Sequence, residues 1–177
     1  FRTRVTESIG EGLLVLENGV VTWANKQACE MYGYDQEEIT GRTSEFLMAD
    51  PSELESVSME AGLAFAAGEV YTRELKAKRK DGTIIDVVVT AALIGRPGVG
   101  AGELVVAVRD ITESKRMREE VEAAAEAYST LFSTAGDALL VHSPEGIIED
   151  ANERATLYTG YSREELLGMR LTDLVPE

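Results

Sequence analysis

The chain of 177 residues has little cysteine, histidine or basic charge: a single cysteine, Cys29, a single histidine, His142, and 17 lysines and arginines against 32 acidic residues. One cysteine excludes an intramolecular disulfide and is typical of a reducing compartment, so we expect a cytoplasmic protein. No apolar run approaches the roughly 20 residues that a membrane-spanning helix needs. The sequence therefore gives no sign of a disulfide scaffold or of a membrane span.

The net charge of −15 also bears on partners. An acidic surface repels phosphate backbones and anionic lipid, so we expect neither nucleic acid nor a membrane surface as a direct partner. Solubility or a salt-rich host is sufficient to account for the charge. Catalytic patterns are missing as well: we find no nucleophile triad, no metal-ligand spacing and no phosphate-binding loop. The glycine-rich residues 95–102 lie between two predicted strands, and we interpret them as a hairpin loop.

An internal repeat organises the chain. Residues 10–48 and 136–175 align with a one-residue gap at Pro144. The second copy reaches the end of the sequence early, so we interpret it as a truncated module. The identical pairs are Leu13/Leu139, Leu14/Leu140, Val15/Val141, Gly19/Gly146, Ala24/Ala151, Asn25/Asn152, Ala28/Ala155, Gly33/Gly160, Tyr34/Tyr161, Glu37/Glu164, Glu38/Glu165 and Gly41/Gly168.

Each copy begins with a predicted β-hairpin followed by a short helix. In the first copy, Leu13–Leu16 and Val20–Trp23 flank a tight turn. Asn25 is placed to cap the following helix, and Gly33 is placed to end it. A longer helical segment is predicted from Pro51 to Ala67.

Three strand-like stretches complete the first copy. Glu69–Lys80 and Thr83–Ile94 are joined by Asp81-Gly82, a strong hairpin signal, and Glu103–Asp110 follows. Strands and helices that are segregated in this way indicate an α+β fold, with helices on one face of an antiparallel sheet.

In this order and spacing, the first copy resembles a PAS domain. The motifs that carry the resemblance are Ala24-Asn25, Gly33-Tyr34, Glu37–Ile39, Gly41, Arg79–Gly82 and Arg109–Thr112. The resemblance implies a five-stranded antiparallel sheet with helices on one face. It divides the chain into a first PAS domain (1–112), a linker helix (113–134) and the N-terminal part of a second PAS domain (135–177).

The resemblance also implies a role in signalling. We expect a sensor of prokaryotic type that relays a cue to a downstream output domain, such as a histidine kinase or a cyclic-dinucleotide enzyme. The alternative is a ligand-free PAS module that serves dimerisation or protein interaction. A cavity that is occupied would distinguish the first hypothesis from the second.

The stretch from Thr112 to Thr134 contains neither glycine nor proline and is predicted to be one helix, with Thr112 as its cap. Its apolar residues are spaced as a heptad seam, which favours a parallel coiled coil between two chains. The alternative is an amphipathic helix that lies on its own domain. The seam residues are Met117, Val121, Ala124, Tyr128 and Leu131.

PAS domains hold haem, flavin, organic acids or nothing in a cavity between sheet and helices. Haem on a histidine is disfavoured in the first copy, because His142 lies in the second and is expected to be an exposed strand-end residue. Residues 41–47 are similar to the flavin-cysteine motif of LOV photosensors, a PAS subfamily. Ser44 occupies the position of the reactive cysteine, and a hydroxyl does not form the flavin adduct, so LOV photochemistry is disfavoured.

Arg73 is the candidate ligand-binding residue. Strand alternation places Arg73 on the face toward the helices, where its charge needs a partner. That partner is either a helix carboxylate, Glu60 or Glu53, or the carboxylate of a small organic acid. The other candidate wall residues are Trp23, Tyr32, Tyr34, Phe46, Phe65 and Tyr71.

Two further features have structural interpretations. Cys29 lies on the first helix and is expected to fill core volume rather than sense redox state. The PAS resemblance suggests that Glu38 and Lys80 meet as a surface ion pair across the first domain.

Overall fold

The computed structural model describes residues 10–94 and 103–174, which form two compact units that divide between Arg116 and Met117. The predicted loop at residues 95–102 lies outside the described residues. The first unit contains an antiparallel sheet of 5 strands in the order β2-β1-β5-β4-β3. Its strands are β1 (Gly12–Glu17), β2 (Val20–Ala24), β3 (Tyr71–Lys78), β4 (Ile84–Ile94) and β5 (Glu103–Asp110).

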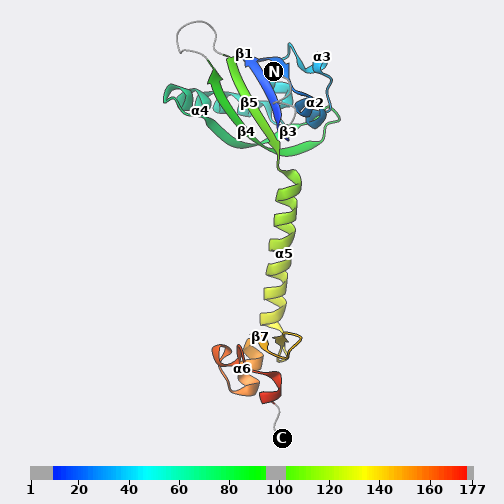
Figure 1. Cartoon of the computed structure of the whole chain (residues 1–177), viewed down its shortest axis with the longest axis vertical. Coiled ribbons are helices and arrows are strands. Elements are labelled where there is room, and N and C mark those ends of the chain that lie inside the picture. Colours follow the sequence, from blue (N-terminus) through cyan, green and yellow to red (C-terminus); the bar gives the residue numbers. More distant parts are fainter. Residues whose placement is uncertain (1–9, 95–102, 175–177) are drawn as a thin grey trace. The chain divides into compact units, whose positions relative to one another are not determined.

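Short helices cover one face of this sheet (Figure 1). Helix α2 contacts β1, and α4 contacts β3 and β4. The helical elements are α2 (Lys26–Tyr32), α3 (Gln36–Ile39), α4 (Leu54–Ala66) and the 3₁₀ turns η1 (Ser44–Leu47) and η2 (Pro51–Glu53). The predicted helix from Pro51 is thus a 3₁₀ turn that continues into α4. The α+β architecture predicted from the sequence is confirmed.

A buried asparagine joins the first hairpin to the first helix. Asn25 is 3% exposed, and its side-chain oxygen accepts from the backbone N–H groups of Ala28 and Leu13, each at 2.8 Å. Its amide nitrogen donates to the carbonyl of Glu11 at 3.1 Å. The side chain therefore caps α2 and also fixes the start of β1, and the predicted N-cap is confirmed.

The second unit repeats this device. Asn152 is also 3% exposed, and its oxygen accepts from Ala155 and Leu139 at 2.9 Å each. Both helices end on a left-handed glycine, Gly33 or Gly160. Besides most of α5, the unit contains β6 (Leu140–His142), β7 (Ile148–Ala151), α6 (Glu153–Thr159), α7 (Arg163–Leu166) and the 3₁₀ turn η3 (Leu171–Leu174).

The core of the second unit is small. The buried residues are Ile148, Ala151, Ala155 and Leu166. Tyr158 on α6 is 86% exposed, whereas its counterpart in the first unit, Met31, is 8% exposed. The face of α6 that carries Tyr158 thus has no covering layer among the described residues. His142 is exposed at a strand end, and its ring nitrogen lies 2.8 Å from the carbonyl of Ser143, as expected.

Helix α5 (Thr112–Thr134) has the predicted bounds, and none of its residues is buried. The helix does not begin with a cap from Thr112, which is its first helical residue. The side chain of Asp110 instead accepts from the N–H of Thr112 at 2.9 Å. The Thr112 hydroxyl accepts from the N–H of Asp86 on β4 at 3.0 Å. No helix among the described residues is long and apolar enough to cross a membrane.

The asparagine bonds give a first prediction. Replacing Asn25 by Ala leaves buried N–H and C=O groups without partners, and we expect the free energy of unfolding to fall by about 2–3 kcal/mol. Chemical denaturation followed by circular dichroism measures this. Asp50→Ala is the matched control, because Asp50 caps the exposed turn η2 through Ser52 at 2.9 Å. Equal losses in the two variants would contradict the role of burial.

Candidate functional site

An apolar cavity of about 450 Å³ lies within the first unit, between the sheet and its helices. This volume falls in the range of roughly 300–1,000 Å³ that is typical of small-molecule sites. Alternating residues of the inner sheet face form one wall, and residues of α4 and η1 form the other. The sheet contributes Leu14, Leu16, Leu75, Val87, Val89, Ala91, Leu104, Val106 and Val108; the helical side includes Leu47, Leu54, Val57, Ala61 and Phe65.

Of the aromatic residues predicted from the sequence, Tyr32, Phe65 and Tyr71 line the cavity. Tyr71 donates a hydrogen bond to Glu60 at 3.3 Å, so its hydroxyl has a partner. Tyr32 is 3% exposed, and no hydrogen bond joins its hydroxyl to another described residue. The fully buried side-chain polar atom that lacks a partner among the described residues is instead Nε of Arg79. Burial, and secondarily the charge of Asp110, raise the pKa of Tyr32, so the phenol stays neutral.

The structure places Trp23 outside the cavity wall, and the reason is a β-bulge. The register between β1 and β2 shifts between Val15 and Leu16, so Thr22 is an extra residue. Val21 pairs with Leu16 on the inner face, but Trp23 pairs with Val15 on the outer face. Simple alternation from Val21 would have kept Trp23 inside, and a bulge of this kind is not visible in the sequence.

Tyr34 and Phe46 also lie outside the cavity wall. Their rings meet edge to face with centroids 5.2 Å apart. The guanidinium of Arg42 lies 3.7 Å from the centroid of Phe46, and the ammonium of Lys80 lies 5.7 Å from that of Tyr34. The two rings therefore form a cation-capped aromatic pair rather than a ligand wall.

Arg73 does not line the cavity either. Its guanidinium pairs with Glu60 at 2.9 Å, and its side chain is 33% exposed. Glu60 is one of the helix carboxylates that the sequence offered as a partner. Because this partner already compensates the guanidinium, Arg73 gives no support to a bound organic acid. The expected Glu38–Lys80 pair is present at 2.6 Å.

Cys29 and Ser44 are the remaining residues that the sequence singled out. Burial, followed by the charge of Asp35, raises the pKa of Cys29, which disfavours the reactive thiolate. Ser44 lies at the cavity wall on η1. No group of three or more potential metal ligands occurs among the described residues.

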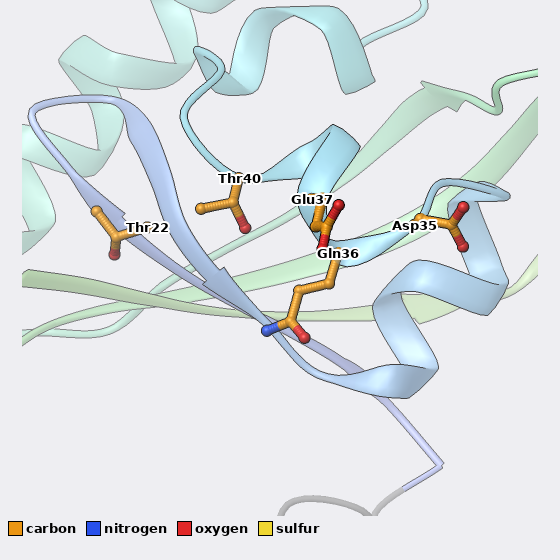
Figure 2. Close-up of a pocket in the computed structure, with 5 residues that line it drawn as sticks. All are labelled: Thr22, Asp35, Gln36, Glu37 and Thr40. Atoms are coloured by element: carbon orange, nitrogen blue, oxygen red, sulfur yellow. The ribbon is translucent and has the colours of Figure 1, made fainter.

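A second depression on the first unit is polar and open. Figure 2 shows its side chains, which lie apart along β2 and α3 without converging on one point. Asp35 is engaged in the capping box of α3 with Glu38. This surface has no arrangement that suggests a ligand. The residues around it are Thr22, Asp35, Gln36, Glu37 and Thr40.

A polar cluster fastens the start of α5 to the sheet; we call it the junction cluster, and its members are Arg79, Asp86, Asp110, Thr112 and Lys115. Arg79 pairs with Asp110 at 2.8 Å. Lys115 of α5 pairs with Asp86 of β4 at 3.1 Å. Asp86 also bonds to the backbone of Ile111 at 2.9 Å. The first turn of α5 is thus held by ion pairs and by backbone bonds to two strands.

The cavity and the junction cluster are linked through Tyr32. The carbonyl of Tyr32 accepts from the N–H of Lys80 at 2.9 Å, in the turn that carries Arg79. Asp110, which accepts from both Arg79 and Thr112, is close enough to raise the pKa of the Tyr32 phenol. Tyr32 therefore contacts both the cavity and the turn that carries Arg79.

The chain matches the PAS domain family over residues 10–113 and 136–177. It belongs to this family, with one PAS module in the first unit and a partial PAS match in the second. PAS domains are regulatory sensor modules rather than catalytic ones. One relative is the sensor protein TdiS of Thauera aromatica, 26% identical over 111 residues, which are 63% of this chain and 20% of that protein. The chain thus spans only a fifth of the length of that relative.

Solved structures share the fold. The PAS domain of a Colwellia psychrerythraea protein gives a TM-score of 0.57 at 23% identity, covering 63% of this chain and 95% of that one. A PAS domain, in complex with ethanol, of a LuxR-family transcriptional regulator from Burkholderia thailandensis gives 0.53 at 20% identity, covering 59% and 91%. A sensory box histidine kinase/response regulator from Burkholderia thailandensis gives 0.55 at 15% identity, covering 72% and 96%.

The junction cluster gives a prediction for pH dependence. Burial alone would raise the pKa of Asp110, but hydrogen bonds from Thr112 and Arg79 outweigh it, and the pKa is lowered. A carboxyl with a lowered pKa stabilises the fold above its unfolded pKa and loses that contribution as pH falls through the folded value. We expect Asp110→Asn to reduce the free energy of unfolding by roughly 1 kcal/mol at pH 7. The difference should shrink below about pH 4.

Urea denaturation at a series of pH values checks this prediction. Glu69→Gln, at an exposed carboxylate preceding β3, is the control and should show little difference from the parent at any pH. A constant deficit of Asp110→Asn down to pH 2 would show that the carboxylate charge does not stabilise the junction.

Proposed function

We propose that the first PAS module senses a small molecule in its cavity and relays binding through the junction cluster to α5, and from there to an output domain. The observation that carries the proposal is the link through Tyr32. This residue borders the cavity, bonds to the turn of Arg79, and lies near Asp110 at the start of α5. The match to a sensor protein supports a signalling role for the whole protein. For that role we propose an output domain such as a histidine kinase or a cyclic-dinucleotide enzyme.

In this mechanism the bistable element is the first turn of α5. Strand β5 runs without a break through Ile111 into the helix, so a displacement of β5 changes the helix start directly. The bonds that resist this displacement are the ion pairs and hydrogen bonds of the junction cluster. A shift of the Arg79 turn would weaken Asp110 as acceptor for Thr112 and change the direction or register of the helix.

We further propose that α5 pairs with α5 of a second chain in a parallel coiled coil. The helix has no buried residue, yet large apolar side chains repeat along it. Their exposed fractions are 57% for Met117, 69% for Val121, 50% for Tyr128 and 72% for Leu131. Exposed apolar residues at heptad spacing are stabilised by a partner helix. A dimer would convert a change at the helix start into a change between two output domains.

Ligand-free interaction is the alternative function, and the size and apolar lining of the cavity argue against it. An empty cavity leaves its walls without dispersion contacts, which destabilises a fold in proportion to the volume.

The relay predicts a local effect of Arg79→Ala. Without this guanidinium, Asp110 loses a partner, and we expect faster amide hydrogen exchange over residues 112–118. The central strands, residues 87–91 and 104–108, should keep the exchange rates of the parent protein. Hydrogen-exchange mass spectrometry measures both segments. Lys26→Ala is the control, because within the described part of the chain Lys26 pairs only with Glu30, on the exposed side of α2. Unchanged exchange at residues 112–118 in Arg79→Ala would contradict the relay.

The coiled coil predicts a loss of dimer. Val121→Glu combined with Tyr128→Glu places charges on the seam, and we expect light scattering to give the monomer mass. Glu119→Lys combined with Glu126→Lys, on exposed polar positions of the same helix, serves as the control and should leave the mass unchanged. A parent protein that is monomeric at micromolar concentration, or a seam variant that remains dimeric, would contradict the proposed pairing.

A further inference from the structure

The polar groups around the cavity limit the chemistry of its ligand. The wall is formed almost wholly by aliphatic side chains of the sheet and of α4. The charged residues that border it, Glu45 and Lys76, keep their charges outside: Glu45 is exposed, and the Lys76 side chain is 67% exposed and pairs with Asp86 at 3.5 Å. No described cation is therefore available within the cavity to compensate a ligand anion.

The nearby guanidinium does not change this conclusion. Arg73 lies outside the wall and is already paired with Glu60 at 2.9 Å. Glu60 in turn accepts from Tyr71 at 3.3 Å. An anionic ligand would have to break this pair and leave the Glu60 carboxylate with only the tyrosine hydroxyl.

Tyr32 offers a hydrogen-bond donor at the edge of the cavity. Tyr32 is 3% exposed and borders the cavity, and its hydroxyl has no hydrogen-bond partner within the described part of the chain. A phenol donates to a carbonyl or hydroxyl oxygen, and it needs no charge on the acceptor. A ligand oxygen at this point would accept from this hydroxyl in a largely apolar site, whose wall also includes Thr43, Ser44 and Ser58.

We propose that the cavity binds a neutral, largely apolar small molecule whose single oxygen acceptor receives a hydrogen bond from Tyr32. This inference rests on the proposed sensing function and specifies its ligand class. It differs from the organic acid expected from Arg73, because charge compensation is absent from the wall. The same hydrogen bond would place the ligand against the residue that leads to the junction cluster.

The test uses three probes of similar size with the full chain: acetophenone, ethylbenzene and benzoate. Acetophenone offers a neutral acceptor, ethylbenzene offers none, and benzoate is anionic. We expect acetophenone to bind more tightly than ethylbenzene, with benzoate weakest, as measured by titration with heteronuclear NMR. Tyr32→Phe keeps the ring and removes the donor. It should raise the Kd of acetophenone about three- to tenfold and leave that of ethylbenzene within about twofold.

Neighbouring residues of β4 give a matched pair of variants that locates the site. Ala91 lines the cavity and pairs with Val106, whereas Ala92 pairs with Val105 on the opposite face. Ala91→Leu should abolish acetophenone binding, and Ala92→Leu should not. Ala61→Phe fills the cavity from α4 and decides the question if Ala91→Leu fails to fold.

The outcomes separate the ligand class from the relay. Benzoate binding as tightly as acetophenone, no binding of either neutral probe at millimolar concentration, or an unchanged Kd in Tyr32→Phe would each overturn the neutral-ligand proposal. Hydrogen exchange over residues 112–118 in the acetophenone complex then tests the relay. Binding with unchanged exchange would contradict the relay and retain the ligand class.

Discussion

The fold depends on a buried asparagine side chain whose amide must form hydrogen bonds with the protein, because burial separates it from water. Asn25 and Asn152 are each 3% exposed, and each serves a strand and a helix at once. An amide in this position is costly without partners, so the hairpin and the helix form their contacts together. The same joint is present in both units, although the hydrophobic core of the second unit is much smaller than that of the first.

From this joint the rest of the first unit follows. Fixing α2 against β1 sets the inner face of the sheet, on which every second side chain is apolar. The helices that cover this face pack on a core that includes Leu14, Val21 and Val108, and they leave a cavity beside it. The sheet therefore serves two purposes: its strands hold the fold through backbone bonds, and its inner face supplies one wall of the cavity.

Much of this architecture was predictable from the sequence because its signals are local. Asn25, Gly33 and Asp81-Gly82 each fix a cap or a turn through their own backbone preferences, and the bounds of β5 and α5 follow from composition alone. The internal repeat adds an independent check on the hairpin and the first helices. These parts needed no long-range information.

The site was less predictable because it depends on register and on pairing across the chain. The bulge at Thr22 turns Trp23 outward, and no local preference marks that residue. The sequence predicted that Arg73 pairs with a carboxylate. It did not distinguish Glu60 from the carboxylate of a ligand, because either would compensate the guanidinium charge. The aliphatic wall corresponds to alternation in Val87–Ala91 and Leu104–Val108, but alternation alone does not distinguish a cavity wall from a packed core.

In the proposed relay, the cavity and the start of α5 are coupled through Tyr32. A ligand bound only by apolar walls would stabilise the unit without favouring any direction of movement. A hydrogen bond at Tyr32 differs, since this residue is held at its backbone by the turn of Arg79 and lies near the charge of Asp110. A ligand shifts the populations of two conformations only if its contacts differ between them, as a contact at such a residue would. In the proposed relay, the polar junction cluster rather than the hydrophobic core is therefore the part of the first unit that ligand binding would bias.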